Sequence, residues 1–108
     1  MCYQLTDNSI IQLVKKCVNI RHLILRNCES ITDNGISIVA RQCPLLHTLN
    51  IAGLHLLTDS SICNIATYCS QLERINLMGL RLITDISIDK LIEHCVDLYQ
   101  VDTNNCDK

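Results

Sequence analysis

Apolar and polar residues alternate in two rhythms along this chain, and the pair of rhythms returns every 26 residues. In the first part of each unit, apolar residues stand at positions i, i+3, i+4 and i+7, which form one stripe on a helix of ~3.6 residues per turn. Each unit is therefore expected to carry one amphipathic helix. The stripes consist of Ile10, Leu13, Val14 and Cys17; Ile36, Val39, Ala40 and Cys43; Ile62, Ile65, Ala66 and Cys69; and Ile88, Leu91, Ile92 and Cys95.

After each stripe the period falls to two, as in a short strand that buries one face. A strand of about five residues, a turn, a helix and a return loop then make one coil of the chain. No single coil can bury its apolar stripe alone, so the coils are expected to stack. The inward strand positions are Leu23 and Leu25, Leu49 and Ile51, Ile75 and Leu77, and Val101 and Thr103.

A Thr-Asp pair precedes every helical stripe. The pairs are expected to start the helices, because Thr or Asp can cap the free backbone N–H groups and the Asp charge interacts favourably with the helix N-terminus. Each helix is expected to end about its last Cys, where Pro44 follows Cys43 in one unit. The pairs are Thr6 and Asp7, Thr32 and Asp33, Thr58 and Asp59, and Thr84 and Asp85.

Self-similarity at a fixed interval of this length predicts an α/β solenoid. We expect a right-handed βα superhelix of four 26-residue repeats, with a parallel sheet on the concave side and the helices outside. The prediction is one domain over residues 1–108, with units at approximately 2–27, 28–53, 54–79 and 80–106. Cys2 already stands where a strand should end, so we expect a piece of a longer solenoid, or a partner over this first edge.

The repeat resembles the cysteine-containing subclass of leucine-rich repeats over essentially the whole chain. The segment "IRHLILRNCESITDNGISIVARQCPLL" carries the pattern L-x-x-L-x-L-x-x-C, then I-T-D-x-x-I, then a helix that ends in Cys. Such repeats occur in F-box/leucine-rich-repeat proteins, which are substrate-recognition subunits of Skp1-cullin-F-box ubiquitin ligases, and in the related antagonist-of-mitotic-exit-network protein. The resemblance implies a non-enzymatic protein-interaction module. The segment contains no F-box, so binding of Skp1 is not expected from it alone.

Composition narrows the function classes. Hydrophobic residues make up 48% of the chain, charged residues 19%, and the formal net charge is -2, which argues against nucleic acid as a partner. No apolar run approaches the ~20 residues of a membrane-spanning helix, and no secretory signal is seen. We therefore expect an intracellular protein, cytoplasmic or nuclear, without a membrane partner.

The eight cysteines follow the repeat rather than an irregular disulfide pattern. Members of a second column interchange with Leu54 and Leu80, which indicates buried, free, structural thiols. Neighbouring column members would lie within disulfide range, but with parallel Cβ vectors. Zinc ligands and a redox switch remain alternatives, and Cys63, outside both columns, is expected on the convex surface. The columns are Cys17, Cys43, Cys69 and Cys95, and Cys2, Cys28 and Cys106.

Neither the acidic column nor the histidines predict a reaction centre or a cofactor. The Asp column could be imagined as a cation ladder, but capping explains the same residues and no further oxygen ligands are in view. His94 precedes Cys95 directly, and adjacent helical residues do not face each other. The chain has only three Gly, and no Gly-rich phosphate loop.

The outward positions of the strands are the predicted site, because their side chains vary while the scaffold columns do not. We expect a protein partner on this concave face; alternatives are a scaffold subunit of a larger assembly, such as the ciliary complexes in which similar repeats occur, and a Cys-based redox- or metal-responsive protein. Loop residues Glu29, His55, Arg81 and Asp107 would extend the rim. The face comprises His22, Thr48, Arg74 and Gln100; Ile24, Asn50, Asn76 and Asp102; and Arg26, Ala52, Met78 and Asn104.

Overall fold

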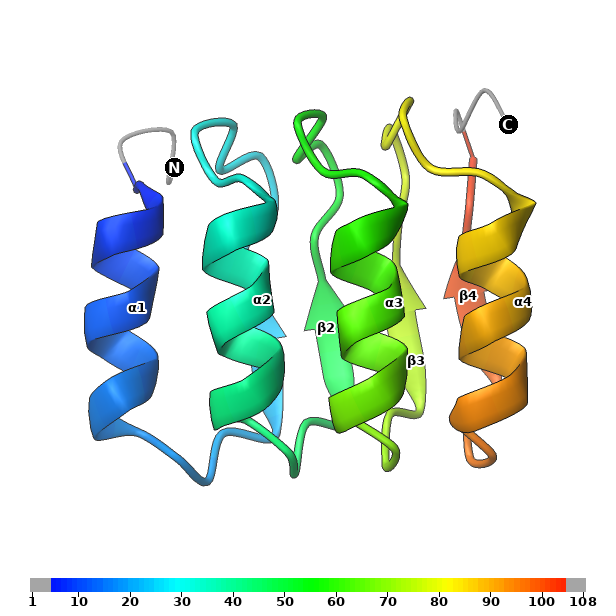
Figure 1. The fold of residues 1–108 in the computed structure, drawn as a ribbon, viewed down its shortest axis with the longest axis horizontal. Helices are drawn as coiled ribbons and strands as arrows, with labels where there is room; N and C mark the ends of the chain where they lie inside the picture. Colours follow the sequence, from blue (N-terminus) through cyan, green and yellow to red (C-terminus); the bar gives the residue numbers. More distant parts are fainter. Residues whose placement is uncertain (1–4, 105–108) are drawn as a thin grey trace.

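The computed structural model describes residues 5–104, in which helices and strands alternate regularly along the chain (Figure 1). Each strand has three residues, fewer than the five expected, and each helix has ten. The elements are α1 (Asp7–Lys16), β1 (His22–Ile24), α2 (Asp33–Gln42), β2 (Thr48–Asn50), α3 (Asp59–Tyr68), β3 (Arg74–Asn76), α4 (Asp85–His94) and β4 (Gln100–Asp102).

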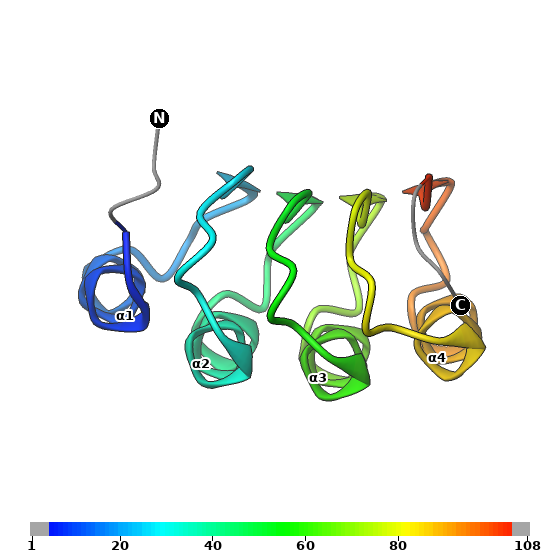
Figure 2. The ribbon, with the colours of Figure 1, turned by 90° about the horizontal axis from the view of Figure 1, so that it is seen from above.

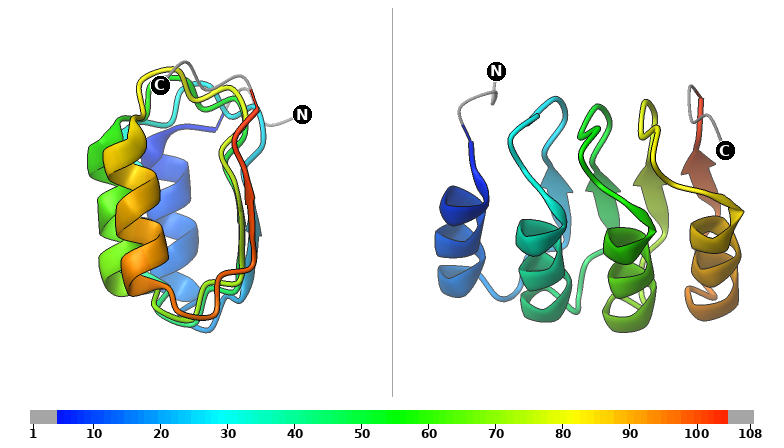
Figure 3. Two further views of the ribbon diagram at one scale, coloured as in Figure 1. Left: turned by 90° about the vertical axis from the view of Figure 1, so that its right-hand side faces the viewer. Right: turned by 45° about the horizontal axis from the view of Figure 1, so that its top comes forward.

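The strands form one parallel sheet in the order β1-β2-β3-β4. Pairing joins each strand residue to the one 26 positions later, as in Leu23 with Leu49 and Leu49 with Ile75. Figure 2 shows the strands in one layer and the helices in a second, more widely fanned layer, so that the sheet lies on the inner side of a shallow arc. Figure 3 shows the loops that close each coil at either end. The predicted alternating α/β architecture with a parallel sheet is confirmed, and it is compatible with a repeat solenoid.

The four Thr residues start the helices. Each adopts an extended backbone at the N-cap, and its side-chain oxygen accepts a hydrogen bond from a backbone N–H two or three residues later. At the other end, the Cys of the stripe is the C-cap, and its N–H donates to a carbonyl four residues earlier, as from Cys43 to Val39. The helix boundaries therefore follow the sequence signals.

The Asp residues lie in the first turns of the helices, and three of them also make contacts that the sequence analysis did not predict. Rather than capping their own helices, they link each coil to the next. The Asp33 carboxylate accepts hydrogen bonds from the Thr58 N–H at 3.0 Å and the Thr58 hydroxyl at 2.6 Å, and Asp59 accepts the same pair from Thr84 at 2.8 and 2.6 Å. Asp7 is bonded in the same way to Thr32. Each Thr thus caps one helix while it is held by the preceding coil.

A column of small residues lies three positions after each Thr and completes this link. The Ser61 hydroxyl donates to Asp33, and the Ser87 hydroxyl donates to Asp59. Both serines are fully buried, yet within residues 5–104 no buried side-chain oxygen or nitrogen lacks a hydrogen bond. Gly35 holds the equivalent place beside Asp7, where an added Cβ would overlap the carboxylate.

The core lies between the two layers. In the two central coils every stripe position is fully buried, including Ile36, Val39 and Ala40. The end coils differ, because Leu13 is 44% exposed and Ile92 is 65% exposed, and Cys17 is exposed as well. Ile88 is half-buried. The expectation that every stripe buries all four members is therefore wrong at these four positions, since each belongs to the first or last coil of residues 5–104 and has a described neighbouring coil on one side only.

One turn position requires a left-handed backbone in every described coil. Asn27, Gly53 and Gly79 occupy equivalent places after the strands and have φ of 64°, 82° and 80°. Glycine adopts this conformation without the steric cost that a Cβ adds. At Gly53 an added Cβ would also meet the side-chain oxygen of Asn27, which would have to move.

The link between coils predicts unequal effects for two equivalent aspartates. Asp59→Ala removes the acceptor of Thr84 and Ser87, so we expect the free energy of unfolding to fall by about 1–3 kcal/mol. Asp85→Ala is the matched control, because Asp85 has the same place on its helix. Within residues 5–104, however, no hydrogen bond is donated to its carboxylate. Urea unfolding followed by circular dichroism measures both. Equal losses would show that the aspartates act only on their own helices.

Candidate functional site

The candidate site is the face of the sheet that turns away from the helices. Alternation along the strands produces it: in β1, Leu23 is buried while His22 and Ile24 on either side are exposed. The parallel register then places His22 beside Thr48, Thr48 beside Arg74 and Arg74 beside Gln100, so outward side chains form continuous rows across the strands.

Seven of the twelve predicted residues line one shallow hollow of about 190 Å³ on this face. The buried strand residues Leu49 and Ile75 complete its lining. The seven are Ile24, Thr48, Asn50, Arg74, Asn76, Gln100 and Asp102.

Hydrogen bonds orient the polar groups of the hollow. The side-chain oxygens of Asn50 and Asn76 accept bonds from the backbone N–H two residues later, at 3.1 and 3.0 Å, which holds each amide at the end of its strand. Arg74 Nη2 donates to the Thr48 hydroxyl at 3.2 Å, and Gln100 donates to Asp102 at 3.3 Å. An Asn amide has two N–H donors besides this acceptor, so the hollow presents donors from Asn and Arg to a partner.

The apolar part of the hollow is Ile24, whose side chain is 59% exposed. Exposed isoleucine beside oriented amide and guanidinium groups combines the apolar and polar components of a protein-binding surface. The hollow is open and shallow, which suits an extended segment of another protein.

The remaining predicted residues lie around the hollow. His22, Arg26 and Asn104 are exposed and Met78 is half-buried, whereas Ala52 is only 6% exposed and offers little surface to a partner. The burial of Ala52 follows from its size, because a methyl group between longer neighbours is easily covered.

A second hollow, of about 370 Å³, lies at the strand-end turns. Glu29, His55 and Arg81, which were expected to extend the rim, line it together with the left-handed turn residues Asn27, Gly53 and Gly79. Asp107, the fourth expected rim residue, lies outside the described residues.

The helix-end cysteines form a buried ladder. The Cys69 thiol donates to the Cys43 carbonyl at 3.4 Å, and the Cys95 thiol donates to the Cys69 carbonyl at 3.5 Å. Burial, with neighbouring Cys43 and Cys95 adding to it, raises the pKa of Cys69 to about 12, and burial also raises the pKa of Cys43 and Cys95. Such thiols are protonated near neutral pH, so the ladder is poorly suited to nucleophilic or redox chemistry.

The second cysteine column departs from the expectation of free thiols. Cys28 is fully buried and disulfide-bonded. Cys2 and Cys106, the other cysteines of that column, lie outside the described residues. The expectation of a free structural thiol is therefore wrong at Cys28.

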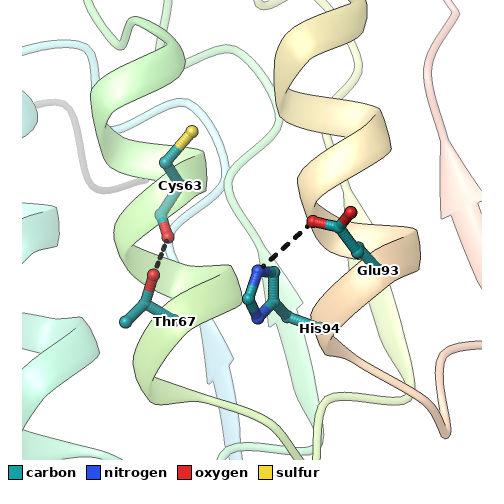
Figure 4. Close-up of polar contacts among 4 residues, drawn as sticks. All are labelled: Cys63, Thr67, Glu93 and His94. Atoms are coloured by element: carbon teal, nitrogen blue, oxygen red, sulfur yellow. Dashed lines mark hydrogen bonds and ion pairs between the residues drawn. The ribbon is translucent and has the colours of Figure 1, made fainter.

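Cys63 and His94 lie on the outer parts of neighbouring helices (Figure 4). The hydroxyl of Thr67 donates to the Cys63 backbone carbonyl at 2.8 Å, and the ring of His94 lies 3.5 Å from Glu93. Cys95 points instead into the core, where it is 2% exposed. His94 is exposed, so the two neighbouring side chains lie on different sides of α4.

Three of the four aspartates of the column, Asp7, Asp33 and Asp59, accept hydrogen bonds from the next coil. Burial raises the pKa of the Asp33 and Asp59 carboxyl groups, but hydrogen bonds from the serine and threonine of the next coil outweigh it, so the pKa of each lies below its ordinary value. Within residues 5–104, no group of three or more His, Cys, Asp or Glu side chains is arranged to hold a metal ion.

No protein-family profile and no curated protein matches the chain. No helix within residues 5–104 has the length and apolar character needed to cross a membrane.

Thiol labelling tests the two classes of described free cysteine. In dilute native protein, exposed Cys17 and half-buried Cys63 are expected to react with a maleimide well before Cys43, Cys69 and Cys95, which need unfolding to become accessible. Intact mass and peptide mapping over time follow the reaction. Early modification of Cys69 would contradict a structural role for the ladder.

The lowered pKa values predict acid sensitivity. A carboxyl group with a lowered folded pKa stabilises the protein fully above its unfolded pKa, about 3.9, and loses this contribution as pH falls through the folded pKa. We therefore expect the free energy of unfolding to fall less between about pH 5 and pH 2 in the double variant Asp33→Asn with Asp59→Asn than in the wild-type chain. Asp89→Asn, on the exposed surface of α4, is the control. An unchanged pH dependence in the double variant would contradict the prediction.

Proposed function

We propose that this chain is a non-enzymatic protein-interaction module of the cysteine-containing leucine-rich-repeat type, and that it binds a protein partner on the exposed face of its sheet. The repeat pattern resembles that subclass over essentially the whole chain. The alternating helices and parallel strands are compatible with this repeat.

The observation that carries the proposal is the hollow across β1 to β4. Its side chains come from successive coils at equivalent positions, yet they differ in kind, from Ile24 to Asn50, Asn76 and Asp102. The positions beneath them stay apolar, as Leu23, Leu49, Ile75 and Val101. A constant scaffold under a varied surface is the arrangement that repeat proteins use for recognition.

The chemistry of the hollow supports a partner segment that offers an apolar side chain and hydrogen-bond acceptors. The apolar group would pack on Ile24, and carbonyl or carboxylate oxygens would accept bonds from Arg74 and the Asn amides. Within this proposal, the module is similar to the substrate-recognition arm of a Skp1-cullin-F-box ubiquitin ligase. Skp1 itself is not expected to bind this segment.

The alternative with a specific observation behind it is a scaffold subunit of a larger assembly. Leu13 and Ile92, which lie on opposite ends of the stack, remain exposed although their equivalents in the other coils are buried. These positions suit contacts with further protein, whatever binds the sheet face.

Reversing the charge of the sheet face tests the main proposal. Partners captured with the wild-type chain are identified by mass spectrometry, and their affinity is then measured by calorimetry. For a partner bound on the sheet face, Arg74→Glu with Met78→Glu should weaken binding by about tenfold or more, equivalent to ~1.4 kcal/mol.

Arg41→Glu with Gln42→Glu is the matched control, because it makes the same charge change on the exposed side of α2. Both variants should retain the circular-dichroism spectrum of the wild-type chain. Loss of binding in the helix-side variant alone would place the partner on the wrong face and contradict the proposal.

A further inference from the structure

One row of outward side chains crosses all four strands and changes in chemistry along its length. The parallel register pairs Ile24 with Asn50, Asn50 with Asn76, and Asn76 with Asp102. All four residues line the hollow on the sheet face, and we call them the central row. Side chains stand roughly perpendicular to a sheet, so a further strand at either edge would lie beside this row and not over it.

The two asparagines in the middle of the central row present N–H donors. In each, the side-chain oxygen accepts a hydrogen bond from the backbone N–H two residues later, at 3.1 Å for Asn50 and 3.0 Å for Asn76. Because a backbone N–H can only donate, the amide oxygen faces it and the NH2 group lies on the other side of the amide. Neither NH2 group donates a hydrogen bond within residues 5–104, so both keep their donors for another acceptor.

The guanidinium of Arg74 lies beside the same two amides. Arg74 precedes Asn76 by two residues on β3, so both side chains leave the same face of the sheet. Nη2 of Arg74 donates to the Thr48 hydroxyl at 3.2 Å, which places the positive charge between β2 and β3. The two amides stand on these same strands. A carboxylate has the charge and the lone pairs to accept bonds from all three groups at once.

The two ends of the central row differ from its middle and from each other. At the β1 end, the side chain of Ile24 is 59% exposed and offers an apolar contact. At the β4 end, Gln100 donates to one carboxylate oxygen of Asp102 at 3.3 Å, and no hydrogen bond from residues 5–104 reaches the other oxygen. Such a carboxylate is suited to a Lys or Arg side chain. The row therefore matches an apolar, an acidic and a basic group, in that order.

The spacing of these three places fits an extended segment that runs across the strands. Neighbouring strands lie about 4.8 Å apart, so the point midway between Asn50 and Asn76 is about 7.2 Å from Ile24 and from Asp102. In an extended segment, residues two apart point to the same side and lie about 6.6 Å from each other. The sheet lies on the inner side of a shallow arc, which brings its outward side chains closer together than the strands themselves (Figure 2). The two spacings therefore agree.

We propose, as a step that rests on the proposed binding face, that the partner is an extended segment of another protein with an apolar residue at i, an acidic residue at i+2 and a basic residue at i+4. The apolar side chain packs on Ile24. The carboxylate at i+2 accepts hydrogen bonds from Arg74 and the two Asn amides, and the basic group at i+4 pairs with Asp102. Charge sets the order, because exchange of the acidic and basic residues brings like charges together at both places.

Labelled peptides test the pattern directly. The first probe has Leu, Asp and Lys at the first, third and fifth of five central residues, with Thr between them and Gly-Ser flanks. The second has the reverse order, since a segment can cross the strands in either direction. One of the two should bind when the chain is titrated to about 100 µM and fluorescence polarisation is followed.

Exchange of Asp and Lys in the peptide that binds keeps its composition and net charge. This exchange should weaken binding by about tenfold or more. Equal affinity for the exchanged peptide, or binding in neither direction, would overturn the proposal.

Asn50→Asp with Asn76→Asp tests the place of the carboxylate. Asp keeps an oxygen for the backbone N–H two residues later, but it replaces the NH2 donors with a negatively charged acceptor. The double variant should bind the Asp peptide at least about tenfold more weakly than the wild-type chain does. Asn8→Asp with Asn34→Asp is the matched control, because it makes the same change at exposed positions of α1 and α2.

The control variant should bind the peptide as the wild-type chain does, and thermal melts show that both variants are folded. An Asp peptide that binds equally well to the sheet variant and the control would show that the amides do not hold its carboxylate.

Asp102→Lys tests the third place by reversing its preference. This variant should lose affinity for the peptide with Lys at the basic position and gain affinity for a peptide with Glu there. A variant that still prefers Lys would contradict the pairing of the basic residue with Asp102.

Partners captured with the wild-type chain separate the pattern from the binding face itself. A partner that is lost on Arg74→Glu with Met78→Glu, but contains no segment of this pattern, would refute the pattern and leave the binding face in place. Captured partners that are all indifferent to that variant, together with peptides that do not bind, would refute both.

Discussion

The hydrogen bonds from Thr58 to Asp33, and their equivalents in the other coils, are the interaction on which the rest of the structure depends. Each Thr fixes the start of its own helix and, through the Asp of the preceding coil, fixes where that helix lies in the stack. Because both roles belong to one residue, a helix cannot shift without losing its cap or its neighbour. The strands beneath are short, and the helix placement keeps them in register.

This coupling explains how a modest chain supports a varied surface. The free energy that holds the coils together comes from buried columns and from the Asp–Thr links, all of which lie away from the outward strand positions. The identities of outward residues such as Ile24, Arg74 and Asp102 can therefore vary to suit a partner without loss of the contacts that stabilise the fold.

Much of this arrangement could be predicted from the sequence, since a pattern repeated every 26 residues reports the same local structure several times. The helix stripes, the Thr caps and the outward strand positions all follow from spacing. The role of the aspartates could not be read in this way, because a Thr-Asp pair looks alike whether the carboxylate turns to its own helix or to a residue 25 positions later. The buried column of Ser61 and Ser87 is the signal that was available, since a hydroxyl repeated beside a helix start implies a fixed acceptor.

Other differences have a common cause, which is that a repeat pattern describes an internal coil. Leu13 and Ile92 match the stripe but lie at the ends, so their burial depends on neighbours rather than on spacing. Ala52 matches the outward column but is too small to reach past its neighbours.

Native-state hydrogen exchange of the Thr58 amide, compared with the amides of the two end helices, tests the coupling of coils most directly. The account predicts that Thr58 N–H, held by Asp33 between two complete neighbours, exchanges as slowly as the core of α2 and α3, and that α1 and α4 exchange faster. A Thr58 amide that exchanges at the rate of an exposed loop, or end helices protected as well as the centre, would contradict it.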